Sequence, residues 1–163
     1  MTEAYPFKHH PCWSENRNDL WERVHLPVAG ICNVKCAFCD HITASSCHLP
    51  RPGYASQLME PSVAVSTTKK LLSERPDLRI VAVAGPGEPL ANSETFATLS
   101  KIRSEHPYVR FCLSTNGVLL EDNVAKLVSL GVETATVTIS TVKPETAALI
   151  YEWAIVDEDI LSG

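Results

Sequence analysis

Residues 79–90, RIVAVAGPGEPL, join a short apolar run to a segment rich in glycine and proline, and this stretch decides the fold class. The run from Arg79 to Ala84 is rich in β-branched residues and stops at Gly85, which predicts a buried strand. Continuous apolar strands of this kind are typical of parallel sheets that are covered on both faces. The stretch therefore predicts an α/β protein with this strand inside its sheet.

Helical and strand patterns alternate on both sides of this strand. Helices are predicted over residues 61–75, 93–105, 121–130 and 144–153, and further strands over residues 22–29, 110–115 and 133–140. This alternation predicts a parallel sheet in a partial (β/α) barrel of about four βα units. Right-handed crossovers place the strand ends, at Ala29, Ala84, Thr115 and Ser140, along one edge, where α/β proteins bind ligands.

The composition is that of an ordinary globular protein with one core. The chain has 163 residues, of which 45% are apolar and 20% are charged. No apolar run approaches the roughly 20 residues of a membrane-spanning helix, and the N-terminus lacks the apolar centre of a secretory signal. We therefore expect a cytoplasmic location and no membrane. The net charge is −5 without a basic cluster, so we expect no nucleic-acid partner.

Three of the six cysteines fall within eight residues, in a predicted connection over residues 30–57. Cys32, Cys36 and Cys39 form a C-x3-C-x2-C pattern. Iron–sulfur clusters bind thiolates, and three ligands leave one iron of a four-iron cluster open to a ligand that is not protein. A structural zinc site normally has paired C-x2-C units or a distant histidine pair, and chance clustering is the remaining alternative. The spacing favours a cluster at a catalytic centre formed by these three cysteines.

Two polar segments follow the second and third predicted strands. They contain Gly85, Gly87, Glu88 and Pro89 in the first segment and Ser114, Thr115 and Asn116 in the second. Glycines permit close approach of a ligand to the backbone, and Glu88 offers an acceptor for a ligand ammonium. Each segment alone is equally well interpreted as a turn, and Thr138 and Ser140 are weaker candidates after the fourth strand. Their place beside the cysteines favours a binding site at this edge.

The cysteine spacing, with Phe38 before the third cysteine and a strand before the first, resembles the radical S-adenosylmethionine (SAM) superfamily. The resemblance implies a partial radical SAM barrel, a [4Fe–4S] cluster on the cysteine triad, and SAM bound at its open iron. It also implies cleavage of SAM to a 5′-deoxyadenosyl radical by an electron from the cluster. By the same resemblance, Phe38 and the two polar segments line the SAM site, and Glu88 lies in the segment that holds the methionine amino group.

Further motifs resemble one family within that superfamily, the maturases of the nitrogenase iron–molybdenum cofactor. They are His10-Pro11-Cys12 with Ser14-Glu15, His25, Cys47 with Arg51-Pro52-Gly53, Gly87 to Asn92, Cys112 to Gly117, and Ile150-Tyr151 with Trp153. The resemblance implies that two further [4Fe–4S] clusters are bound as precursors and joined, with insertion of a carbide derived from a SAM methyl group. It covers nearly the whole chain, from about His9 to Trp153.

This resemblance gives the cysteines outside the triad a role. It implies that His25, Cys47 and Cys112 bind one precursor cluster and that Cys12 contributes to the second. Taken alone, Cys112 is equally a small buried hydrophobic residue, and His25 is equally a strand histidine with a structural hydrogen bond. The partners that we expect are iron–sulfur cluster donors and a reductant.

The sequence predicts three parts: an N-terminal segment over residues 1–21, a partial barrel over residues 22–153, and a tail over residues 154–163. The family has a fuller barrel, and an open half-barrel exposes unpaired strand edges. We therefore expect a truncated protein, a fragment, or a chain whose barrel a partner completes. Two other functions stay open: a cluster- and SAM-binding module without turnover, and a radical SAM enzyme that acts on an organic substrate.

Overall fold

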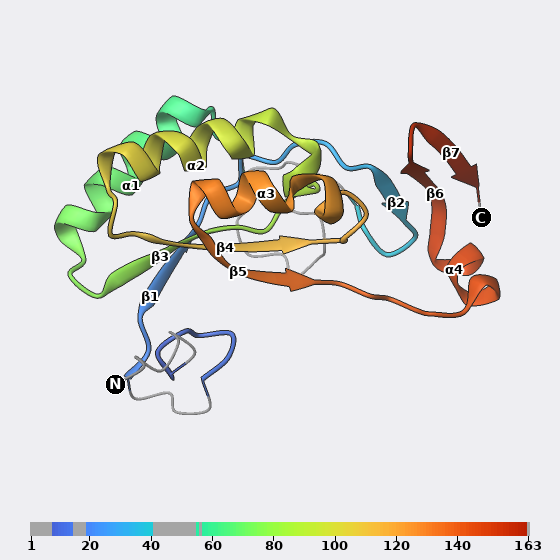
Figure 1. Ribbon diagram of the computed structural model, residues 1–163, viewed down its shortest axis with the longest axis horizontal. Coiled ribbons are helices and arrows are strands. Elements are labelled where there is room, and N and C mark those ends of the chain that lie inside the picture. The colour runs from blue at the N-terminus through green and yellow to red at the C-terminus, as the bar shows by residue number, and fades with distance from the viewer. Residues whose placement is uncertain (1–7, 15–18, 41–54, 56, 163) are drawn as a thin grey trace.

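Four parallel strands form the central sheet of the computed structural model, which describes residues 8–14, 19–40, 55 and 57–162. The strands are β1 (Glu22–His25), β3 (Leu78–Val83), β4 (Arg110–Thr115) and β5 (Val132–Val137). They lie in the order β1-β3-β4-β5, and every neighbouring pair is parallel (Figure 1). The predicted α/β fold with four strands in a parallel sheet is confirmed.

Three helices cover one face of this sheet (Figure 1). They are α1 (Pro61–Glu74), α2 (Ser93–Glu105) and α3 (Leu120–Leu130). Apolar side chains of the helices and strands meet between the two layers, where Val81, Leu99 and Phe111 are almost completely buried. Gly131 ends α3 with φ of 75°, a left-handed conformation that glycine adopts without strain. No helix in the described part of the chain is long and apolar enough to cross a membrane.

The opposite face of the sheet is lined by a smaller group of side chains. Ile80, Ala82 and Cys112 are buried there, and Trp21 packs against them. Figure 1 shows the N-terminal segment on this side, away from the helices. Its residues are tied to the start of β1, because the His9 ring stacks on Trp21 with centroids 5.2 Å apart. This face corresponds to the interior of the predicted barrel.

A second, antiparallel sheet lies beside the C-terminal ends of the parallel strands (Figure 1). It consists of β2 (Val34–Cys36), β6 (Tyr151–Val156) and β7 (Asp159–Ser162), in the order β2-β6-β7. The short helix α4 (Pro144–Ile150) precedes β6. Asp157 and Glu158, both with positive φ, form the turn between β6 and β7. The predicted cysteine connection therefore contains a strand, and part of the predicted tail is a hairpin.

The sequence prediction placed the ends of three elements too far along the chain. The first strand ends at His25 and not at residue 29, and the fourth ends at Val137 and not at residue 140. The last helix ends at Ile150 and does not reach Trp153, because the chain there pairs with the cysteine loop. In that pairing Lys35 lies opposite Trp153, a long-range contact that overrides the local helical pattern.

Candidate functional site

The cysteine triad lies on a loop that the antiparallel sheet holds in place. The Ala37 amide donates to the carbonyl of Ile150 at 2.8 Å, and the Ile155 amide donates to the carbonyl of Asn33 at 2.8 Å. The Cys39 amide donates to the carbonyl of Cys36 at 3.1 Å, which closes a tight turn between two of the three cysteines. Backbone hydrogen bonds thus fix the triad loop even though it lies outside the main sheet.

The three triad thiols lie close enough together to influence one another electrostatically. Burial is the main cause that raises the pKa of Cys36 to about 11, and the charges of Cys39 and Cys32 raise it further, whereas Lys35 lowers it. Burial also raises the pKa of Cys32. Three partly buried thiolates repel one another, and this cost is offset when they bind iron. The donor set therefore fits a thiolate-ligated iron–sulfur cluster.

A structural zinc site is the alternative to an iron–sulfur cluster at the triad, and the two need different ligand arrangements. A structural zinc ion needs its ligands to converge on one point. Among the described residues, no group of three or more His, Cys, Asp or Glu side chains is arranged to hold a metal ion in this way. A four-iron cluster takes each thiolate on a different iron, so its ligands need not converge.

Glu88, predicted to lie in the SAM-binding segment, joins the ends of two strands. Its carboxylate is 3% exposed and accepts hydrogen bonds from the Thr115 hydroxyl at 2.6 Å, the Asn116 amide at 2.7 Å and the Leu90 amide at 3.1 Å. A carboxylate has about four acceptor sites, so three of them are used within the chain. Glu88 also acts on the triad, because its charge raises the pKa of Cys32.

Asn92 is a residue of this edge that the sequence analysis did not select as a site residue. Its side-chain oxygen accepts from the amides of Gly30 and Ile31 at 3.0 and 3.1 Å. Its side-chain nitrogen donates to the carbonyls of Ile31 at 2.9 Å and Glu88 at 2.7 Å. One buried amide thus joins the start of the triad loop to the glycine segment. Its place in the Gly87 to Asn92 motif was the available signal.

The glycine segment approaches the triad loop closely. The Gly87 amide donates to the carbonyl of Ala29 at 2.7 Å, and a β-carbon at Gly87 would collide with the backbone of Ile31. Gly85 has φ of 126°, a conformation that L side chains rarely adopt. Pro89 begins a short 3-10 helix, η3 (Pro89–Ala91). The predicted need for glycine at this turn has a steric basis in the structure.

The third strand end also contacts the triad loop. The Asn116 side chain donates to the Asn33 side-chain oxygen at 2.7 Å, and Asn33 is the residue that follows Cys32. The buried side-chain nitrogen of Asn33 has no hydrogen-bond partner among the described residues. Ser114 is half-buried on β4, and Phe38 is 53% exposed. The structure thus brings Glu88, Thr115 and Asn116 together at the triad, with Phe38 on its exposed side.

The predicted ligands of precursor clusters lie on the inner sheet face, apart from the triad. His25 pairs in register with Ala82, Ala82 with Cys112, and Cys112 with Thr134, so these residues form one row across four strands. With strands spaced about 4.8 Å apart, the His25 and Cys112 backbones are about 10 Å apart over the small side chain of Ala82. Cys47 lies outside the described residues.

Cys12 reaches the same face from the N-terminal segment. It is exposed, and its charge raises the pKa of the buried Cys112 thiol, although burial is the largest cause of that shift. His25 is exposed as a whole residue, but its ring is partly shielded from water. This desolvation is the main cause that lowers the pKa of His25, and the charge of Arg23 lowers it further. Cys12, His25 and Cys112 are therefore gathered around one part of the sheet face.

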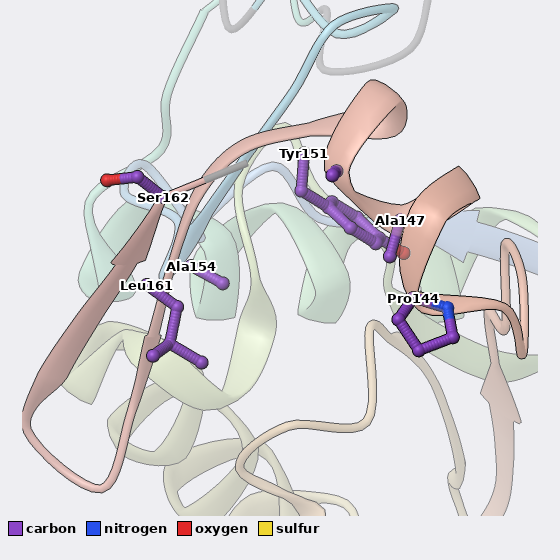
Figure 2. A pocket seen from close by; sticks show the side chains of 7 residues that line it. Pro144, Ala147, Tyr151, Ala154, Leu161 and Ser162 are labelled. Carbon is purple, nitrogen blue, oxygen red and sulfur yellow. The ribbon is translucent and has the colours of Figure 1, made fainter.

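A separate apolar groove lies between α4 and the β6–β7 hairpin, and Figure 2 shows its lining side chains. Pro144, Ala147 and Tyr151 line one side of it, and Ala154 and Leu161 line the other. None of the predicted site residues lines this groove. It lies next to the hairpin that holds the triad loop and is not part of the cysteine sites.

Comparison with known proteins agrees with this geometry. The family model described as the radical SAM superfamily matches residues 26–160. The chain belongs to the radical SAM superfamily. Membership implies a [4Fe–4S] cluster and SAM as cofactors, and the triad, with the Glu88 and Asn116 segments beside it, provides a site of the right donor type in this radical SAM domain.

Several curated radical SAM relatives share the name "FeMo cofactor biosynthesis protein NifB". The chain is 40% identical over 160 residues to the protein of Methanocaldococcus infernus, covering 98% of this chain and 53% of that protein. It is 43% identical over 155 residues to the protein of Klebsiella pneumoniae, covering 94% of this chain and 33% of that protein. The chain thus spans about half or less of the length of these relatives.

Proposed function

We propose that this radical SAM enzyme acts in nitrogenase cofactor biosynthesis, where it fuses two [4Fe–4S] clusters with carbide insertion to form the precursor of the iron–molybdenum cofactor. The observation that carries the proposal is the second group of cluster-type ligands, Cys12, His25 and Cys112, on the inner sheet face. A radical SAM enzyme that acts on an organic substrate with its triad cluster alone has no need of such a group. The names of relatives such as those above support the same role.

At the triad edge, the chain would hold its cofactors with residues that are already fixed. Cys32, Cys36 and Cys39 would bind the resident cluster, which supplies the electron that cleaves SAM when it is bound. Glu88 would present its remaining acceptor site to the SAM ammonium, and its three internal hydrogen bonds hold the carboxylate in place. The unpaired Asn33 amide would offer a donor to a bound carboxylate or cluster sulfide.

At the inner face, the residues would hold the clusters that are the substrates of the reaction. His25 and Cys112 would bind one precursor cluster together with Cys47, and Cys12 would contribute to the other. Thr115, which belongs to the triad edge, lies three residues beyond Cys112 on β4, about 10 Å along the strand. This spacing supports the proposal that the substrate clusters would lie within reach of a radical generated at the edge.

The proposal includes partners and a location. Iron–sulfur cluster donors would deliver the precursors, and a reductant would supply the electron; a partner chain that completes the barrel is part of the same proposal. The five cysteines in the described residues are all free thiols. Because free thiols persist in a reducing compartment, we propose that the protein acts in the cytoplasm.

Iron and sulfide counting after anaerobic reconstitution tests the proposal. The triad cluster alone gives about four irons per chain, and precursor binding raises the count to about eight or more. SAM that carries a labelled methyl group is then added with dithionite, and the label is sought in the isolated cluster fraction. We expect label there and 5′-deoxyadenosine in solution.

Three outcomes would contradict the proposal. About four irons with formation of 5′-deoxyadenosine would favour an enzyme that acts on an organic substrate. About eight irons without 5′-deoxyadenosine would favour a binding module that holds clusters without turnover. Label that stays out of the cluster fraction would contradict the carbide step.

A further inference from the structure

Arg23 is a cationic side chain of the inner face to which no sequence motif assigned a role. It lies on β1, two residues before His25, and is half-buried. Its Nη1 donates a hydrogen bond to the Cys12 sulfur. Arg23 lies opposite Ile80 and Cys112 lies opposite Ala82, so both side chains are on the inner face, and the charge of Arg23 lowers the pKa of the Cys112 thiol. One guanidinium thus donates to Cys12 and acts electrostatically on Cys112, two cysteines from distant parts of the chain.

A second set of contacts joins the same two cysteines through His10. The Cys12 amide donates to His10 Nδ1 at 3.2 Å, and His10 Nε2 lies 3.3 Å from the Thr134 hydroxyl. Because Nδ1 accepts, the proton of the neutral ring is on Nε2, which donates to the Thr134 oxygen. The Thr134 hydroxyl is then free to donate to the Cys112 sulfur, which lies opposite it on the neighbouring strand, and Thr134 lowers the pKa of that thiol.

The charges at this face explain why a cation is placed there. Cys12 and Cys112 repel each other as thiolates, since the charge of Cys12 raises the pKa of Cys112 while that of Arg23 lowers it. Thiolate-bound clusters carry net negative charge, so two clusters bound side by side repel each other as well. The planar guanidinium has five N–H donors, enough to contact two sulfur ligands at once.

The other arginine of this face has different partners. Arg110 forms a salt bridge with Glu133 and stacks over the Trp21 ring at 4.7 Å. Its charge is therefore paired with a carboxylate, whereas Arg23 donates to the sulfur of Cys12. The two arginines on the same face thus have separate roles.

We propose that Arg23 is a positioning residue that bridges Cys12 and Cys112, the ligands of the two precursor clusters, and offsets the repulsion between the clusters as they are held side by side. This inference rests on the proposed function and deepens it, because it names the residue that lets two anionic substrates approach. Arg23 would act through the ligands and not on the reacting atoms.

The test uses the full chain with its triad cluster already reconstituted. This protein is titrated anaerobically with a synthetic thiolate-ligated [4Fe–4S] cluster, and bound iron is counted after gel filtration. We expect Arg23→Gln to bind the additional clusters about tenfold or more weakly, because a charge-assisted hydrogen bond is lost. Arg23→Lys should recover most of this loss, since it keeps the charge.

A redox titration followed by electron paramagnetic resonance supplies a readout that a structural role would not move. Removal of a cation near a cluster favours its oxidised form, so the midpoint potential of the additional clusters should fall in Arg23→Gln and recover in Arg23→Lys. The triad cluster should keep its potential in both variants. Arg79→Gln, which removes an exposed positive charge at the start of β3, serves as the matched control and should leave all potentials unchanged.

Several results would overturn the inference. Wild-type affinity and potential in Arg23→Gln would do so, and so would equal losses in Arg23→Lys and Arg23→Gln without a change in potential. If Arg23→Gln cannot hold the triad cluster, the test rests on Arg23→Lys. A midpoint potential of the additional clusters that differs from wild type in Arg23→Lys would then count against the inference. Failure of the wild-type chain to bind any cluster beyond the triad would instead contradict the proposed function.

Discussion

The triad edge and the inner sheet face both gather cysteines, but they differ in how the chain has prepared them. At the triad edge, Glu88 and Asn92 are at most 4% exposed and are tied to neighbouring segments by short hydrogen bonds. At the inner face, Cys12 and His25 are exposed. Under the proposed function, the difference teaches that the site of a resident cofactor is built in advance, whereas the site of incoming substrates stays open.

The largest expected effect comes from removing a triad ligand. Cys36→Ala should reduce the iron content by about four per chain, because an oxygen-labile cluster with only two protein ligands does not persist. Cys112→Ser is the matched control, since it removes a thiol from the inner face and should leave the triad iron in place. Iron counting after anaerobic reconstitution is combined with electron paramagnetic resonance of the reduced cluster with and without SAM, because only the triad cluster has an open iron for SAM. Loss of the SAM-dependent signal in both variants would erase the distinction between the regions.

The next largest effect is expected at Gly87, where the glycine segment meets the triad loop. Gly87→Ala places a β-carbon against the backbone of Ile31, which cannot move without shifting the loop. We expect a loss of about 3 kcal/mol in the free energy of unfolding, measured by urea denaturation, together with poor cluster uptake. Gly30→Ala is the control, because its β-carbon would meet only the flexible end of the Leu58 side chain.

Asn92→Ala tests the buried network by itself. It removes four hydrogen bonds, two accepted from the amides of Gly30 and Ile31 and two donated to the carbonyls of Ile31 and Glu88, and each contributes about 0.5–1.5 kcal/mol. We therefore expect a loss of roughly 2–4 kcal/mol in the free energy of unfolding. Asn123→Ala, which removes one hydrogen bond to the carbonyl of Leu119 on α3, should cost about 1 kcal/mol or less. Similar losses of unfolding free energy in both variants would show that the Asn92 hydrogen bonds stabilise the chain no more than the single Asn123 hydrogen bond does.

The sequence predicted the parallel sheet well because its signals are local. The run from Arg79 to Ala84 and the glycine at residue 131 mark a strand and a helix end without reference to the rest of the chain. The antiparallel sheet was not predicted, because β2 is three residues long and pairs with a strand more than a hundred residues away. The aromatic and β-branched residues between Tyr151 and Val156, namely Tyr151, Trp153, Ile155 and Val156, were the signal that a strand starts there.

The residues of the candidate site also differ in whether a local sequence signal marks them. Cysteine spacing predicted the triad, because ligands close in sequence are close in space. The roles of Asn92 and Arg23 depend on contacts over long sequence separations, 61 residues for Asn92 with Ile31 and 11 residues for Arg23 with Cys12. Asparagine and arginine are common in surface loops and strands, so neither is distinguished until folding brings it to its partner.

The smallest effect on the folded chain is expected at the inner face. His25→Gln changes an exposed side chain at the end of β1, so the free energy of unfolding should change by less than about 0.5 kcal/mol. The iron beyond the triad cluster should nevertheless decrease, because a ligand of one precursor cluster is lost. On the same preparation, urea denaturation checks the free energy of unfolding and iron counting checks the iron bound beyond the triad cluster. A large loss of stability would contradict the description of this face as open.

The central claim, that the triad is the site of SAM cleavage, is tested most directly by the 5′-deoxyadenosine that the reconstituted chain forms with dithionite and SAM. We predict product from the wild-type chain and from Cys112→Ser, and none from Cys36→Ala. Product from Cys36→Ala, or none from a wild-type chain that carries its triad cluster, would contradict the claim.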